Sequence, residues 1–278
     1  MISCPTVEKK VIRYHYNLTT FFYWLLWGKH IHHGLWEGNE SCAAAQLNLT
    51  ETLASLAQVT PDCRLLDVGC GMGGSSIHLA RKFKADVTGV TISPVQRRWA
   101  ATSAMMAGVG GRTQFICQDA EQVEFEPDSF DRIWSIECTE HLFDKPAFFK
   151  KAVSWLKPGG RVSICAWLAG DHVESAEDIQ QVYDVCEGFF CPSLGSSADY
   201  VEWLTDAGLE MEHELDWTER VDRTWEICKS RMQKTGMPWL ARMIDQDTVM
   251  FLDRFETILK AYRTGAMKYG CFVAHKPE

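Results

Sequence analysis

Between residues 61 and 169, hydrophobic positions follow two alternating patterns. Short runs rich in Val, Ile and Leu, typical of buried strands, alternate with longer segments whose apolar residues recur every three or four positions, as in helices. This pattern predicts strands at 63–69, 85–92, 113–120, 130–138 and 161–169, helices at 75–83, 94–109 and 145–156, and a turn at 157–160. Strands separated by helices predict βαβ units, and therefore a parallel sheet covered on both faces.

The flanking segments read differently. Residues 1–58 are rich in aromatic side chains and predict an N-terminal helical segment, which leaves 59–278 as the α/β core. Helical patterns at 178–190, around Trp225 and at 242–265 predict helical insertions at about 169–208 and 222–265. Two more alternating stretches predict strands at 209–217 and 268–276. No repeat or linker interrupts the chain, so we expect one domain.

Charge and cysteine usage narrow the class of protein. The 278 residues carry a net charge of -9, and the densest basic cluster is the pair Arg97-Arg98, which argues against a nucleic-acid partner. The 11 cysteines show no paired spacing, which is typical of free thiols in a reducing compartment. The start lacks the pattern of a secretory signal, and the apolar run 21–27 is too short to span a bilayer. We expect a soluble cytoplasmic protein without a transmembrane segment; the oligomeric state stays open.

The stretch "LLDVGCGMGGSS" lies between a predicted strand and a predicted helix and fits two ligand-binding templates. Gly69, Gly71 and Gly74 have the spacing of a dinucleotide-binding turn. Asp67, Gly69, Gly71 and Gly73 have the D-x-G-x-G-x-G spacing found where S-adenosylmethionine binds. In either case the glycines allow the backbone to approach the ligand, and the helix N-terminus adds positive potential.

Carboxylates distinguish the two templates. A dehydrogenase needs an acid about 20 residues further on for the ribose hydroxyls, and Thr91 occupies that place. Arg97 or Arg98 would suit a 2′-phosphate, but both fall within a helical pattern and are better explained as surface charge. Asp67 would repel a pyrophosphate but suits the ammonium group of a methionine moiety. The sequence therefore favours S-adenosylmethionine over NAD(P).

Several motifs carry a family resemblance. The segments "LLDVGCGMGGSS", "GVTISPVQ", "ICQDAE", "DRIWSIECTEHL" and "LKPGGRVSIC" occur in the order found in class I S-adenosylmethionine-dependent methyltransferases. The segments "WGKHIHHGLWE" and "AYRTGAMKYGCFVAHKP" resemble the tocopherol O-methyltransferase branch and its bacterial small-molecule relatives, and "HYNLTTFFYWLLWG" is similar to the lid of cyclopropane fatty acid synthases. The resemblance implies a Rossmann-like, mostly parallel seven-stranded sheet with an added helical lid.

The same resemblance implies a set of cofactor-binding residues: Asp67, Gly69, Gly71, Gly73, Thr91, Gln96, Asp119, Ala120 and Ile136. By this comparison, Asp67 and the glycines would contact the methionine portion, and Thr91 with Gln96 would replace the usual ribose-binding acid. The adenine would meet the Asp119 carboxylate and the backbone N–H of Ala120. The remaining residue, Ile136, would lie beside the methyl sulfonium.

Two segments supply candidates for chemistry. The segment "ECTEHL" follows the fourth strand, and ligands of open α/β sheets bind at the carboxyl ends of strands. There His141 is suited to take a phenolic or hydroxyl proton, and Glu140 or Glu137 could orient it or stabilise a cation. Alternatively, the Glu-His pair only organises the turn.

The second segment is "HIHHG", with three histidines in four residues. No further ligands with recognisable spacing accompany them, so we expect no metal site. We expect this segment to lie in the lid, with His33 a possible base. The remaining predicted acceptor-binding residues are polar or aromatic side chains of the added segments: Tyr16, Tyr23, Trp27, His32, Trp36 and Trp217.

Together these features predict methyl transfer from S-adenosylmethionine to a hydrophobic small molecule, since the added segments are aromatic and lack a cluster of charged side chains. A prenylated phenol, terpenoid, polyketide or alkaloid fits, with O-methylation or ring C-methylation favoured. One alternative is methylation or cyclopropanation of an alkene through a carbocation. Another, from a different class, is a non-catalytic cofactor-binding partner protein.

Overall fold

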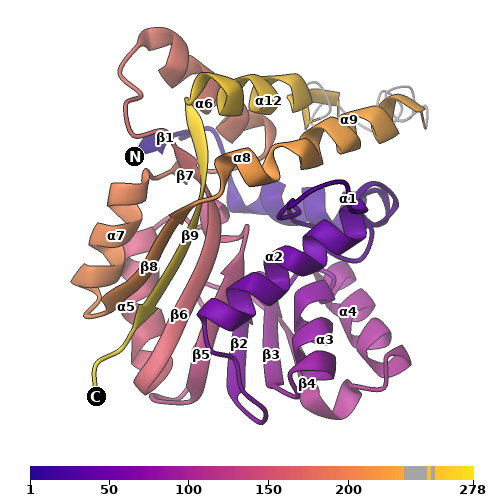
Figure 1. Cartoon of the computed structure of the whole chain (residues 1–278), viewed down its shortest axis with the longest axis vertical. Coiled ribbons are helices and arrows are strands. Elements are labelled where there is room, and N and C mark those ends of the chain that lie inside the picture. The colour runs from indigo at the N-terminus through magenta and orange to yellow at the C-terminus, as the bar shows by residue number, and fades with distance from the viewer. Residues whose placement is uncertain (235–248, 252–253) are drawn as a thin grey trace.

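A central sheet organises the chain in the computed structural model, which describes residues 1–234, 249–251 and 254–278 (Figure 1). Within these residues the sheet has seven strands: β2 (Arg64–Val68), β3 (Asp86–Thr91), β4 (Thr113–Cys117), β5 (Phe130–Ile136), β6 (Leu156–Ala169), β8 (Glu210–Asp216) and β9 (Met267–His275). Their order is β4-β3-β2-β5-β6-β9-β8. Of these strands β9 alone runs opposite to its neighbours, pairing antiparallel with β6 and β8. The predicted Rossmann-like, mostly parallel sheet is confirmed.

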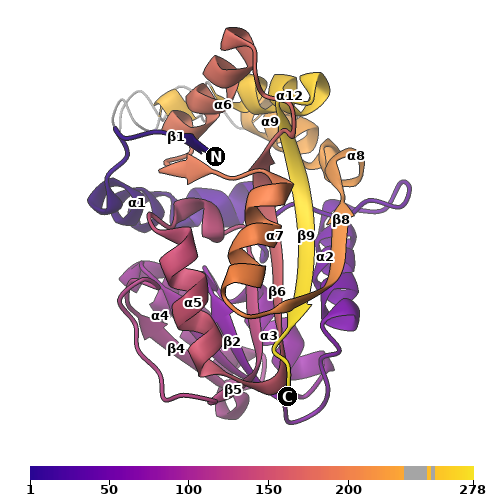
Figure 2. The same ribbon diagram turned by 90° about the vertical axis from the view of Figure 1, so that its left-hand side faces the viewer.

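Helices cover both faces of the sheet because its strands are apolar on both faces. In β2, Leu65 and Leu66 are both fully buried but belong to opposite hydrophobic clusters. One cluster includes residues of α2 (Cys42–Leu56), α3 (Gly74–Lys82) and α4 (Pro94–Met106). The other includes residues of α5 (Lys145–Trp155) and α7 (Ser197–Asp206), which lie side by side in Figure 2.

The added elements lie over the carboxyl ends of the parallel strands, in the upper half of both views (Figures 1 and 2). They are the two-stranded sheet of β1 (Ile2–Ser3) and β7 (Ser193–Leu194) and the helices α1 (Lys9–Trp27), α6 (Ala176–Gly188), α8 (Thr218–Val221), α9 (Arg223–Lys234) and α12 (Phe255–Thr264). Two short 3-10 helices, η1 (Gly110–Arg112) and η2 (Thr139–His141), complete the described elements. We call the added elements the lid, because they cover the strand ends where ligands of such sheets bind.

The structure differs from the sequence prediction in three places. The expected turn at 157–160 is part of β6, because its backbone continues to pair: Gly159 N–H donates to the Lys276 carbonyl and Lys276 N–H to that of Gly160. The helices α2 and α7, which fall within segments predicted as lid or insertion, pack in the clusters that cover the sheet. Of the helix predicted at 242–265, residues 242–248 and 252–253 lie outside the described residues, and α12 accounts for its end.

Two general features bear on the class of protein. Among the described residues, no helix has the length and apolarity needed to cross a membrane. All 11 cysteines are free, and of these only Cys117 is exposed.

Strand β9 is essential to the core because Phe272 is fully buried and its ring stacks on that of Tyr200 at 5.1 Å between centroids. We expect Phe272→Ala to lower the free energy of unfolding by about 3–5 kcal/mol, since the substitution leaves a cavity between the sheet and α7. Urea unfolding followed by circular dichroism measures the change. The matched control is Phe143→Ala, at a half-exposed position, which should cost less than about 1 kcal/mol. Equal losses for the two variants would contradict this account of β9.

Candidate active site

Three cavities meet at the carboxyl ends of β2, β3 and β5, beneath the lid. The first is lined by the glycine loop and by Asp67, the second by the ends of β3 and β5 and by the start of α1, and the third by residues of the lid and of the segment 137–141. Ile31 lines all three. We refer to them as the loop cavity, the strand-end cavity and the chamber. Because the three are contiguous, one elongated ligand could fill the first two and present its middle to the third.

The loop cavity contains a buried carboxyl group. Asp67 lies near the end of β2 and is 3% exposed, and among the described residues its carboxyl group accepts a hydrogen bond only from the Ser76 hydroxyl. Burial raises the pKa of the Asp67 carboxyl to about 7, although the bond from Ser76 opposes this. A buried carboxylate needs a cationic partner, and the ammonium of a methionine moiety would supply one. This site fits the predicted cofactor and not a pyrophosphate.

The glycines of the loop differ in what they do. Gly69 and Gly71 line both the loop cavity and the strand-end cavity, and both have positive φ. At Gly69, a Cβ would stand 2.2 Å from the Cys138 sulfur, so only glycine fits there. Gly73 also has positive φ, but it lines neither cavity and faces the side chains of Ala100 and Phe115. Its role is therefore in the packing of the loop.

In the strand-end cavity, Thr91 and Gln96 occupy the place of the usual ribose-binding acid. The Thr91 hydroxyl donates to Gln96 Oε1 at 3.1 Å, and both side chains line the cavity. The Gln96 Nε2 group is buried and has no hydrogen-bond partner among the described residues. A buried donor without a partner is costly, and a ribose hydroxyl could accept from it. The pair thus suits a nucleoside.

The other predicted nucleoside contacts, Asp119 and Ala120, line the same cavity. Asp119 accepts a hydrogen bond at 2.7 Å from the Nζ of Lys9, which is the first residue of α1. Lys9 also forms an ion pair with Glu121. Although burial opposes it, these carboxylates raise the pKa of Lys9. The Asp119–Lys9 pair ties the lid to the cofactor site. Sequence patterns gave no signal for Lys9, because its partners are more than a hundred residues away.

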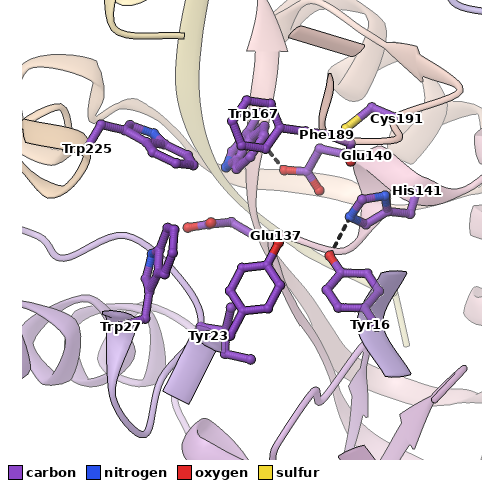
Figure 3. A pocket seen from close by; sticks show the side chains of 11 residues that line it. Tyr16, Tyr23, Trp27, Glu137, Glu140, His141, Trp167, Phe189, Cys191 and Trp225 are labelled. Atoms are coloured by element: carbon purple, nitrogen blue, oxygen red, sulfur yellow. Dashed lines mark hydrogen bonds between the residues drawn. The ribbon is translucent and has the colours of Figure 1, made fainter. Parts of the chain in front are cut away.

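The chamber is lined mainly by aromatic side chains, with two carboxyl groups and a histidine among them (Figure 3). It encloses about 40 Å³ and is lined by Tyr16, Tyr23, Trp27, Ile31, Glu137, Glu140, His141, Trp167, Phe189, Cys191 and Trp225. In Figure 3 the rings from α1 lie on one side, and Glu140, His141 and Cys191 lie on the other. Tyr16, Ile31, Glu137 and His141 also line the strand-end cavity. A ligand in the chamber would thus lie directly against one in the cofactor cavities.

His141 faces the chamber with a defined tautomer. Its Nδ1 lies 3.0 Å from the Phe190 carbonyl, which can only accept, so Nδ1 carries the proton. Its Nε2 therefore accepts from the Tyr16 hydroxyl, at 2.8 Å. Burial lowers the pKa of His141 to about 4, so the ring is neutral at physiological pH. The arrangement provides an uncharged proton acceptor at the chamber wall.

The two glutamates of the segment "ECTEHL" have opposite protonation states at neutral pH. Burial raises the pKa of Glu140 to about 8; one of its oxygens accepts from the Trp167 backbone N–H, and the other is buried with no partner in the part of the chain that the structure describes. Burial also tends to raise the pKa of Glu137, but the charge of His33 and its hydrogen bonds to the carboxylate have a larger effect, so the pKa of Glu137 is lowered. Glu137 is consequently a carboxylate in the chamber wall, while Glu140 holds its proton at neutral pH.

The histidine loop places its three rings differently. His33 donates both its backbone N–H and its Nδ1–H to Glu137 Oε1, which also accepts from the Tyr269 hydroxyl, so His33 lies behind the chamber wall rather than in it. His32 contacts Thr50 and Ser75 and lines the loop cavity, as does His30. In the parts of the chain that the structure describes, no three His, Cys, Asp or Glu side chains form a group able to hold a metal ion.

Of the residues predicted to bind the acceptor, Tyr16, Tyr23 and Trp27 line the chamber and His32, Trp36 and Trp217 do not. Trp36 packs against Cys42 and Ala45 and donates its ring N–H to Thr224. Trp217 is buried in the core, before α8. Trp36 and Trp217 were predicted to bind the acceptor from their aromatic character alone. That character does not distinguish a ring that lines a cavity from one that packs against a helix.

The chain was compared with known proteins. Residues 5–269 match the family described as Mycolic acid cyclopropane synthetase. A relative from Arabidopsis thaliana, "Tocopherol O-methyltransferase, chloroplastic", is 31% identical over 97% of this chain and 82% of its own length. Two solved structures have a TM-score of 0.86: the [4+2]-cyclase SpnF, 22% identical over 99% of this chain and 98% of its own, and the cyclopropane synthase MmaA2 from Mycobacterium tuberculosis, 19% identical over 98% and 99%. The latter two show the shared fold.

Fold, site and relatives together define an S-adenosylmethionine-dependent methyltransferase, an enzyme whose cofactor is S-adenosylmethionine. Within that class, the chain belongs to the mycolic acid cyclopropane synthetase family. The dehydrogenase and the non-catalytic binding protein considered from the sequence are thereby set aside.

The raised pKa of Asp67 predicts pH-dependent cofactor binding. Because the ammonium of the ligand pairs with the carboxylate form, binding must release the proton that Asp67 holds below about pH 7. We expect the Kd for S-adenosylhomocysteine to rise up to about tenfold per pH unit as the pH falls below 7, and to level off above it.

Calorimetry between about pH 5.5 and 7.5 measures this dependence. The Asp67→Asn variant should bind at least about tenfold more weakly at neutral pH, with no such pH dependence. Cys117→Ser, at an exposed cysteine, serves as the control and should bind as the wild type does. A wild-type Kd in Asp67→Asn would remove Asp67 from the cofactor site.

Proposed function

We propose that this enzyme transfers the methyl group of S-adenosylmethionine to an oxygen, or to an activated ring carbon, of a hydrophobic small molecule. The observation that carries the proposal is the junction at Ile31, Glu137 and His141. There a neutral histidine in an apolar chamber borders the cavity that fits the cofactor. The cofactor, when bound, supplies an electrophilic methyl group on a sulfonium.

In this proposal the chain's own residues position the acceptor and accept its proton. A phenol or alcohol becomes an effective nucleophile as its proton leaves. The Nε2 of His141 is the acceptor for that proton, directly or through the hydroxyl of Tyr16, which lies 2.8 Å from it. The hydrogen bond from Nδ1 to the Phe190 carbonyl keeps Nε2 in the accepting state and would stabilise the imidazolium that forms.

The walls of the chamber favour an apolar, planar acceptor. Trp27, Trp167 and Trp225 contribute flat rings, with the Trp167 and Trp225 centroids 5.6 Å apart at an interplanar angle of 75°. Such surfaces bind aromatic or prenylated compounds, and their exclusion of water favours displacement at the methyl group. Prenylated phenols, terpenoids, polyketides and alkaloids all suit this chamber. The name of the tocopherol relative supports the first class.

A second candidate is methylation of an alkene carbon through a cationic intermediate, as the family name suggests. Its support is the ionised Glu137 among the aromatic rings, since both carboxylates and ring faces stabilise a cation. We assign this electrostatic role to Glu137 in place of Glu140, because the raised pKa of Glu140 keeps that group protonated at neutral pH. His141 would then take the proton that the cation loses.

We also propose that the enzyme is located in the cytoplasm and acts in secondary metabolism. The free cysteines support a reducing compartment, while the name of the Arabidopsis relative places that protein in the chloroplast.

His141→Ala should lower kcat at least about a hundredfold, the usual contribution of a general base, and leave the Kd for S-adenosylhomocysteine within about twofold. Turnover is measured as the release of S-adenosylhomocysteine with a panel of prenylated phenols, amines and alkenes. Since the pKa of His141 is lowered to about 4, the wild-type kcat should hold as the pH falls through 6.5 and decline only near 4.

The matched control is His172→Ala, at an exposed histidine, which should retain wild-type turnover. Glu137→Gln distinguishes the two candidates: a strong loss of kcat with alkene acceptors alone favours the cationic route. If His141→Ala turns over every accepted phenol at the wild-type rate, the role of this histidine as base is excluded.

A further inference from the structure

The last two turns of helix α1, residues 21–27, are apolar around the whole circumference. Tyr23, Leu26 and Trp27 are buried against the domain, whereas Trp24 and Leu25 are 41% and 48% exposed. A helix that is hydrophobic on every side is ordinarily buried on every side. The outward side of α1 therefore leaves a costly apolar surface in water.

A groove of about 1220 Å³ runs along this outward side, between α1 and helices α2, α3 and α4. Trp24 and Leu25 line it from α1, and Val95, Trp99 and Met106 line it from α4. Trp24 and Trp99 lie 6.0 Å apart between ring centroids. Met106 is 85% exposed. Large apolar side chains of two helices thus form one continuous exposed surface, of the kind that marks an interaction site.

The charges around the groove are all of one sign. Lys29, Arg81 and Arg98 line it and are exposed, and no Asp or Glu is among the described lining residues, although the chain has a net charge of -9. None of the three cations is in an ion pair with a described residue. Apolar side chains flanked by unpaired cations complement a partner that is apolar inside and negatively charged outside.

A second copy of the chain matches this surface poorly. A two-fold interface brings the same patch together from both copies, so Lys29, Arg81 and Arg98 would face their own counterparts. An anionic bilayer has the required polarity instead. Tryptophan rings favour the interface between headgroups and acyl chains, and each Lys or Arg near such a surface strengthens binding about fivefold.

We propose that α1 and α4 form a docking surface for an anionic phospholipid bilayer. Trp24, Leu25 and Met106 insert at the boundary of headgroups and acyl chains, while the three cations contact headgroup phosphates. The proposal does not depend on the acceptor or on methyl transfer. The groove and the chamber are nevertheless neighbours, because Trp27 lines the groove on one side and the chamber on the other. A hydrophobic acceptor dissolved in the bilayer would lie one side chain away from the chamber.

The test is flotation of the full chain with vesicles, without cofactor or acceptor. One set is phosphatidylcholine, and the other contains about 30% phosphatidylglycerol. We expect binding to the anionic vesicles at least about tenfold tighter than to the neutral ones, and a marked weakening at about 0.5 M salt. Equal binding to both sets, or none to either, overturns the proposal.

Two pairs of variants locate the surface. Leu25→Ser should weaken binding about fivefold or more, while Ile179→Ser, at a similarly exposed aliphatic side chain on α6 (48% and 43% exposed), should not. Arg98→Glu should weaken it about tenfold, while Lys150→Glu, the same charge change on α5, should not. Unchanged S-adenosylhomocysteine affinity shows that each variant is folded. Equal effects within either pair, or a lipid-free dimer in sedimentation velocity that Leu25→Ser dissociates, overturns the proposal.

Discussion

The cofactor site depends on a carboxyl group, that of Asp67, which the fold buries without a cationic partner among the described residues. Asp67 stands near the end of β2, where the chain turns into α3, and within the described part of the chain only the Ser76 hydroxyl bonds to its carboxyl group. Burying a carboxylate in this way costs free energy that a bound ammonium would recover. The turn has little freedom to accommodate anything else, because Gly69 lies against Cys138. Recognition of the cofactor thus begins with an electrostatic need of the protein itself.

One lid helix connects this cofactor site with the acceptor chamber. Along α1, Lys9 bonds to Asp119, Asn17 to Ser93, and Tyr16 to His141. The first contact lies at the strand-end cavity, the second at the start of α4 and the third at the chamber, so the same helix borders both sites. The small volume of the chamber follows from this closure, since pockets that hold drug-sized ligands are usually several hundred Å³.

Local features of the chain predicted the strands, the glycine loop and the significance of Thr91 at the end of β3. They did so because periodicity and the residues that follow a strand are local properties. Contacts between distant segments could not be predicted in this way: His33 meets Glu137 across 104 residues, and Lys9 meets Asp119 across 110. Trp36 was predicted to bind the acceptor for a similar reason. It is aromatic like the chamber residues, and only the packing of the folded chain shows that it lies elsewhere.

The backbone of Glu137 has a φ of 52°, in the left-handed region that side chains other than glycine and asparagine seldom adopt. This conformation costs of order 1 kcal/mol and directs the carboxylate into the chamber while its backbone N–H bonds to Cys165. Glycine would relax the main chain here and remove the charge at the same time. Thermal robustness and the proposed electrostatic role of Glu137 therefore pull this position in opposite directions, and a screen that selects only for heat resistance would tend to erase the carboxylate.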